Sequence, residues 1–131
     1  ILGHIPEGDG LLMGLLLLEI VAARGRRLHE LIADMMEQLG PVHYGRSDRH
    51  TRPFDKKELV QQLVSRVPER IAGLLVSRVD NSDGVKYRFG DEGWLLIRPS
   101  GTEPVLRVYA EARDSAAVQA LLEAGAALAE Q

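Results

Sequence analysis

Apolar residues recur along the first forty positions with the spacing of two helices. An aspartate suited to capping a helix stands at position 9, and the apolar run after it extends to Arg24, where Gly25 ends it. A second helix is expected at 28–39, with one apolar stripe and with Gly40-Pro41 at its end. The stripe consists of Leu28, Leu31, Ile32, Met35 and Leu39.

The first of these helices is apolar on nearly every side, whereas a surface helix shows a polar face. It needs cover on most sides, and the chain offers little to cover it. We therefore expect the chain to be the C-terminal part of a longer protein, and we expect this helix to promote self-association when it is uncovered. The run 11–23 contains Glu19 and is shorter than the roughly 20 apolar residues of a membrane span, so no membrane partner is expected.

From position 54 the pattern changes to short strands between two helices. Helices are expected at 55–66 and from Ser115 onwards, and strands at 74–79, 85–89, 94–98 and 105–113. This α-β-β-β-β-α order with short glycine turns predicts an α+β domain, a four-stranded antiparallel sheet with helices on one face. Residues 42–53 are mostly polar and are expected to be a linker and hinge between domains at 1–41 and 54–131.

Composition and charge exclude several classes of function. The 131 residues are 45% hydrophobic and 27% charged, which is typical of a soluble globular protein. The absence of cysteine excludes disulfides, thiolate catalysis and cysteine-bound zinc, and it suits a reducing, cytoplasmic location. The net charge is −3, and residues 51–131 contain 11 Lys or Arg against 12 Asp or Glu. Nucleic-acid binding through an exposed sheet is therefore disfavoured.

The most informative segment lies between the last two expected strands and reads Arg98-Pro99-Ser100-Gly101-Thr102-Glu103-Pro104, with Arg107 soon after. Two hydroxyls flank a glycine, and two arginines flank the turn. Such a turn offers N–H groups, O–H groups and guanidinium forks to one small anion, for which phosphate is the natural candidate. Two other interpretations stay open: the segment is a plain turn, or Glu103 neutralises one arginine structurally.

This segment resembles the Arg-x-Ser-(Gly/Asn)-Thr-x-Pro loop of the α-D-phosphohexomutases, which include phosphoglucomutases, phosphomannomutases and phosphoglucosamine mutases. The runs 83–86, 93–98 and 106–111 are also similar to the family, and 3–10 resembles the end of its third domain. The resemblance implies a TATA-box-binding-protein-like last domain at 54–131, preceded by a helical remnant of the third α/β domain at 1–41. It implies that the substrate phosphate is bound by Arg98, Ser100, Gly101, Thr102 and Arg107.

The resemblance also implies what the parent protein does. Such enzymes move a phosphate between C1 and C6 of a hexose through a phosphoserine and a bisphosphorylated intermediate, here glucose 1,6-bisphosphate, with Mg²⁺ as the cofactor. The family's serine, metal and sugar loops lie upstream of the matched region. We therefore expect no catalytic residue and no metal ligand on this chain, and no turnover by the chain alone. Pro99 and Tyr109 favour a phosphoglucomutase, and His4 is a candidate substrate contact.

One alternative belongs to a different class of function. The arginine-hydroxyl loop could belong to a non-catalytic domain that recognises a phosphorylated or acidic partner. The remaining histidines, His29, His43 and His50, are interpreted as surface residues, since their spacing is not typical of metal ligands.

Overall fold

The computed structural model describes residues 8–51, 54–101 and 103–130 of the chain. The chain divides into two compact units, residues 1–40 and 41–131. We call the first the helical unit and the second the sheet unit, and each is described by itself.

The helical unit consists of the two expected helices, α1 (Gly10–Arg24) and α2 (Leu28–Leu39). The side chain of Asp9 caps α1 by accepting a hydrogen bond from the amide of Leu12 at 2.9 Å, and Gly25 ends it in the left-handed region at φ +60°. Neither helix contains a buried residue. Leu11 is 77% exposed and Leu18 66% exposed, so the apolar surface that the sequence indicated is uncovered. Self-association stays a prediction.

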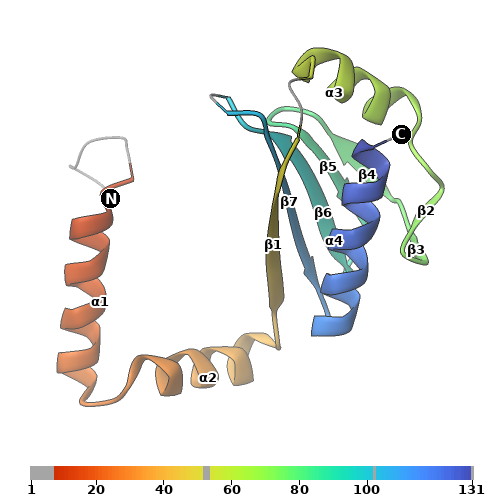
Figure 1. The fold of residues 1–131 in the computed structure, drawn as a ribbon. Coiled ribbons are helices and arrows are strands. Elements are labelled where there is room, and N and C mark those ends of the chain that lie inside the picture. The colour runs from red at the N-terminus through yellow and green to blue at the C-terminus, as the bar shows by residue number, and fades with distance from the viewer. Residues whose placement is uncertain (1–7, 52–53, 102, 131) are drawn as a thin grey trace. The chain divides into compact units, whose positions relative to one another are not determined.

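The sheet unit has the predicted α+β architecture, built on a five-stranded antiparallel sheet in the order β1-β7-β6-β5-β4 (Figure 1). Its strands are β1 (His43–His50), β4 (Arg78–Asp80), β5 (Val85–Arg88), β6 (Gly93–Pro99) and β7 (Val105–Ala112). Its helices are α3 (Lys56–Ser65) and α4 (Ser115–Ala129), and a small hairpin pairs β2 (Arg70–Ile71) with β3 (Leu74–Leu75). The single strand expected at 74–79 is thus divided between β3 and β4.

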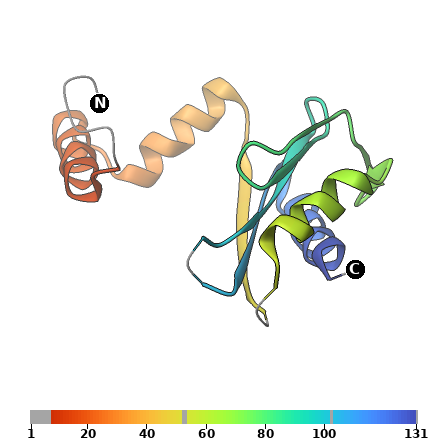
Figure 2. The ribbon, with the colours of Figure 1, turned by 90° about the horizontal axis from the view of Figure 1, so that it is seen from above.

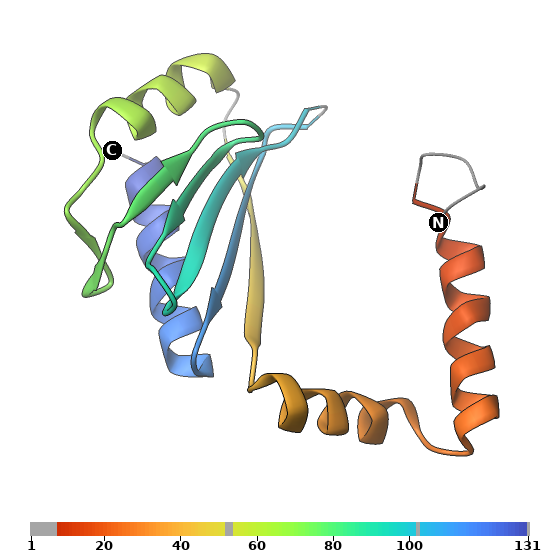
Figure 3. The same cartoon turned by 180° about the vertical axis from the view of Figure 1, so that it is seen from behind.

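Both helices of the sheet unit contribute to a core on one face of the sheet. Leu63 of α3 and Leu121 of α4 pack in one cluster with alternate residues of the central strands, among them Leu95 and Val108. Figures 1 and 2 show α4 lying along this face. Figure 3 shows the opposite face, with α4 behind the strands. The side chains of the opposite face alternate with the core residues, and Arg98 and Arg107 lie on that face.

The expected strand count and the expected linker both need correction. Residues 43–50 were expected in the connector 42–53, but they form β1, which pairs with β7 from His43 opposite Ala112 to His50 opposite Val105. The sheet therefore has five strands rather than four. The inward positions of β1 include Gly45 and Ser47, which are small. A Cβ added at Gly45 would lie 2.7 Å from Cγ1 of Val118 in α4, so the close helix excludes the large apolar residues by which a strand is recognised.

Tyr87 joins the sheet to α3 and gives the fold a dependence on alkaline pH. Its side chain is fully buried, and its hydroxyl donates to the carbonyl of Leu63 at 3.0 Å. Burial raises the pKa of Tyr87 to about 12 from 10.0. The unfolded chain therefore loses this proton first as the pH rises. The contribution of Tyr87 to stability is present in full below pH 10 and is lost as the pH rises through about 12.

We expect the melting temperature to fall across this alkaline window, and to fall less steeply in Tyr87→Phe, which has no proton to lose. At neutral pH Tyr87→Phe loses one buried hydrogen bond, which costs about 1 kcal/mol. Thermal unfolding followed by circular dichroism at several pH values would measure both effects. Parallel slopes in the two proteins would show that other groups cause the alkaline loss.

Candidate functional site

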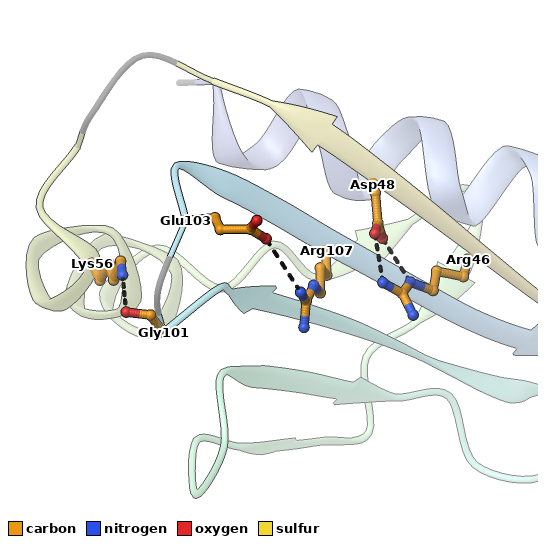
Figure 4. Close-up of polar contacts among 6 residues, drawn as sticks. All are labelled: Arg46, Asp48, Lys56, Gly101, Glu103 and Arg107. Atoms are coloured by element: carbon orange, nitrogen blue, oxygen red, sulfur yellow. Dashed lines mark hydrogen bonds and ion pairs between the residues drawn. The ribbon is translucent and has the colours of Figure 1, made fainter. Parts of the chain in front are cut away.

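Hydrogen bonds from within the loop, from the end of β1 and from α3 hold the loop between β6 and β7 in place. Within the loop, the amide of Ser100 donates to the carbonyl of Val105 at 2.8 Å. At the end of β1, the amide of Thr51 donates to the carbonyl of Pro104 at 2.9 Å. From the first turn of α3, Nζ of Lys56 donates to the carbonyl of Gly101 at 2.7 Å (Figure 4). Segments 45 or more residues away in sequence thus fix the shape of the loop.

The two arginines named from the sequence are brought together. Arg98 in β6 and Arg107 in β7 are direct cross-strand partners on the face opposite the core. Side chains in such positions start from Cβ atoms about 4.5–5.5 Å apart, and like charges there are destabilising. The pair lies where both strands meet the loop, beside the nearly buried Ser100, which is 3% exposed. An anion bound at this end of the sheet would relieve the repulsion.

Arg98 has a carboxylate partner that the sequence did not indicate. Its Nε donates to Oδ1 of Asp83 at 2.9 Å, with side chains 44% and 69% exposed. Asp83 comes from the turn before β5. Beside this pair, a groove of about 450 Å³ is lined by Lys56, Lys57, Val60, Gln61, Asp83, Gly84, Arg98 and Pro99. Three of these lining residues are cationic and one is anionic.

Arg107 is less well satisfied. Its Nε is buried and has no hydrogen-bond partner among the residues that the structure describes. Glu103, which we considered as its structural neutraliser, has its carboxylate oxygen 3.9 Å from Nη2 of Arg107 and is 63% exposed (Figure 4). At that distance the contact is an ion pair without a hydrogen bond. Glu103 therefore offsets part of the charge of Arg107 but leaves its buried Nε without a partner among the described residues.

The other nearby carboxylate is committed elsewhere. Asp48 lies opposite Arg107 in the β1–β7 register. Its two oxygens accept hydrogen bonds from Nε and Nη2 of Arg46, as Figure 4 shows. These bonds hold the pKa of Asp48 below its usual value, and Arg107 lowers it further to a smaller extent. Asp48 is thus ionised and turned towards Arg46, so it does not satisfy Nε of Arg107.

The remaining residues of the predicted site are placed as follows. Gly101 is exposed, and a Cβ added there would meet no atom within 4 Å. The space beside this glycine is therefore open to a ligand. Thr102 and His4 lie outside the described residues. Altogether the described site offers two guanidinium groups and a nearly buried serine at one open glycine, a donor set suited to a phosphate or a similar oxyanion.

No metal centre accompanies this site in the described part of the chain, where no three His, Asp or Glu side chains gather as a ligand group. Among the same residues, no helix combines the length and the apolar character needed to cross a membrane.

Sequence reasoning missed Asp83 and Lys56 as parts of the site. Asp83 was visible as the first residue of an Asp-Gly turn and as part of the run 83–86 that resembles the family, but neither observation gave it a role in the site. Lys56 was visible only as the start of a helix. Their contacts with Arg98 and Gly101 span 15 and 45 positions, and no short motif reports contacts of that kind.

Two family models match the chain. The model described as phosphoglucomutase/phosphomannomutase, C-terminal domain, matches residues 55–128. The model described as phosphoglucomutase/phosphomannomutase, alpha/beta/alpha domain III, matches residues 1–39. The first match includes the whole β6–β7 loop and both arginines.

Curated relatives agree with these matches. A phosphoglucosamine mutase of Methanococcus aeolicus is 38% identical over 117 residues, which is 89% of this chain and 24% of the relative. A phosphoglucosamine mutase of Halorhodospira halophila is 36% identical over 127 residues, with 92% and 24% covered. A phosphoglucomutase/phosphomannomutase of Thermococcus kodakarensis is 32% identical over 123 residues, with 94% and 25% covered. The chain thus spans about a quarter of the length of the relatives that it matches.

Proposed function

Because the chain belongs to the phosphoglucomutase/phosphomannomutase family, we propose that it is the substrate-phosphate-binding portion of a phosphohexomutase. In this proposal Arg98 and Arg107 grip the phosphate of a hexose phosphate with their guanidinium groups. Ser100, Gly101 and Thr102 complete the cradle with hydroxyl and backbone N–H donors.

One observation supports this assignment above the others. Arg98 and Arg107 are direct partners on the adjacent strands β6 and β7 near the loop. The buried Nε of Arg107 lacks a partner among the described residues. An unpaired buried donor beside a like charge is costly to the folded chain. A bound phosphate would accept hydrogen bonds from both arginines, and so would remove both the unpaired donor and the repulsion. A plain turn would have no need of such a pair of arginines.

The proposed role of the chain is to hold the end of the substrate that is not reacting. A phosphohexomutase transfers phosphate between C1 and C6 through a phosphoserine and a hexose bisphosphate, so the sugar must be held by either phosphate in turn. Fixing one phosphate limits the positions of the other end, and positioning of this kind lowers reaction barriers. We place the hinge for this movement at Gly40-Pro41, where the two units meet in sequence, because residues 43–50 belong to the sheet.

The choice of sugar and the requirement for a metal ion are properties of the parent protein. The relatives named above include two phosphoglucosamine mutases, so the preference for glucose that we drew from Pro99 and Tyr109 has no support from them, and a hexosamine phosphate is an equal candidate. Family membership implies a parent that uses Mg²⁺. The described residues do not fit that ion, since they contain no group of metal ligands, and no step of the proposed role passes through it.

The proposal predicts that the 131-residue chain binds inorganic phosphate, glucose 6-phosphate and glucosamine 6-phosphate saturably and with similar affinity. Amide NMR titrations at constant ionic strength should show shifts at Ser100 and Gly101. Arg98→Ala should weaken all three ligands by about 10-fold or more, the value of one charge-assisted contact. The matched control is Arg113→Ala, an exposed arginine just after the far end of β7. Equal loss in both variants, or no saturation by any ligand, would contradict the proposal.

A further inference from the structure

The contact between Asp83 and Arg98 is too exposed to serve mainly as a stabilising ion pair. The Asp83 side chain is 69% exposed and that of Arg98 44%. Ion pairs at that exposure contribute little to the free energy of unfolding, because water and salt screen them. The hydrogen bond from Nε of Arg98 to Oδ1 of Asp83 has an ordinary length, 2.9 Å. Because the ion pair adds little to the free energy of unfolding, its main effect is on the orientation of the Arg98 side chain.

The backbone before β5 fixes the place of Asp83. Gly84 has φ +84°, and a Cβ added there would lie 2.5 Å from the carbonyl oxygen of Ile97 and 3.0 Å from Cα of Arg98. The turn therefore lies against the backbone of β6 at the residue whose side chain Asp83 contacts. On the other side of the turn, the carboxylate of Asp80 accepts from the amide of Ser82 at 2.9 Å. Asp83 is thus presented to Arg98 from a turn constrained at both ends.

The chemistry of the guanidinium group shows what this contact achieves. Asp83 occupies the Nε donor, which leaves the two terminal nitrogens of Arg98 without a partner among the described residues. Those two nitrogens form the edge of the planar group that can grip two oxygens of one phosphate. We propose that Asp83 is a positioning residue, which holds the guanidinium plane of Arg98 so that this edge faces the substrate phosphate. The inference rests on the phosphate-binding role proposed above.

Orientation and charge have opposite effects here, and this makes the proposal testable. The carboxylate of Asp83 orients Arg98, but its negative charge repels a phosphate. Asparagine at this position keeps an oxygen that accepts from Nε and removes the charge. Alanine removes both. A positioning role therefore predicts that Asp83→Ala weakens phosphate binding, whereas Asp83→Asn restores it to the wild-type level or beyond.

The test is a titration of the 131-residue chain and its variants with inorganic phosphate at constant ionic strength. It is followed by the side-chain Nε–Hε signal of Arg98 and the amide signal of Gly101 in ¹⁵N NMR spectra. We expect Asp83→Ala to weaken phosphate binding by about 10-fold, because a misoriented Arg98 loses its charge-assisted contact with the phosphate. We expect Asp83→Asn to bind phosphate at least as tightly as the wild type. The matched control is Asp91→Ala, an exposed aspartate in the turn between β5 and β6, which should change nothing.

Each outcome bears on one claim. If Asp83→Ala binds as the wild type does while Arg98→Ala loses binding, the positioning role is overturned and the phosphate site stands. If Asp83→Ala and Asp83→Asn are equally weak, the charge of Asp83 and not its orienting bond matters, and the proposal is overturned. If Arg98→Ala binds phosphate normally, the proposed function itself fails. Melting temperatures of the variants show whether a loss of binding reflects a loss of folded protein.

Discussion

Gly93→Ala is expected to destabilise the sheet unit by about 3–5 kcal/mol, the range reached by the most damaging single substitutions. Gly93 begins β6 with φ +134°, and a Cβ added there would lie 2.0 Å from the carbonyl oxygen of Glu111 in β7. The carbonyl oxygen belongs to the main chain, and the backbone fixes the position of a Cβ, so no change of rotamer relieves this clash. Strands β6 and β7 would have to separate at the end away from the loop that joins them, and the neighbouring hydrogen bonds between them would be lost.

The same turn provides a matched control. Gly90 has φ +61°, and a Cβ added there would meet no atom within 4 Å. Gly90→Ala therefore suffers only the conformational penalty of the left-handed region, about 1–2 kcal/mol. Urea unfolding followed by the fluorescence of Trp94, which lies in β6, would measure both variants. Equal midpoints for the two alanine variants would mean that the strand start adapts, and that the close approach at Gly93 is not required.

Much of the fold could be predicted because its helices have clear ends and its central strands are apolar. Helix α1 begins after Asp9 and ends at Gly25, as its caps indicated. Strand β7 was expected at 105–113 and lies at Val105–Ala112. Strand β1 could not be found in this way. Its inward residue Gly45 is small because α4 lies directly over it, so its sequence contains no apolar alternation.

The residues of the candidate site also differ in whether the sequence indicates them. The sequence names Arg98, Ser100, Gly101 and Arg107 as candidates because they lie within residues 98–107, which resemble the family's loop and the strand that follows it. It does not name Asp83, because the role of that residue depends on the close approach of another turn to β6. Local spacing reports which donors a loop offers. The partners that orient those donors come from distant segments, and only the packed sheet shows them.

Arg107→Met is expected to weaken phosphate binding by about 10- to 150-fold, the equivalent of a charge-assisted contact of 1.5–3 kcal/mol. The same substitution should leave the unliganded chain as stable as before, or more stable by about 1 kcal/mol. Methionine keeps much of the length of the side chain, while it removes the buried Nε that lacks a partner among the described residues. It also removes the repulsion from Arg98 across the strand pair.

Arg88→Met is the matched control, because Arg88 is an exposed arginine of β5 at the other end of the same sheet face. Phosphate titration by NMR and thermal unfolding of both variants would give the two quantities. A structural arginine would show the reverse pattern, with Arg107→Met less stable and phosphate affinity unchanged. Loss of binding together with unchanged or higher stability is the behaviour of a residue retained for its ligand at a cost to the fold. That result would indicate that the Nε donor of Arg107, which has no partner among the described residues, is a cost to the fold that phosphate binding relieves.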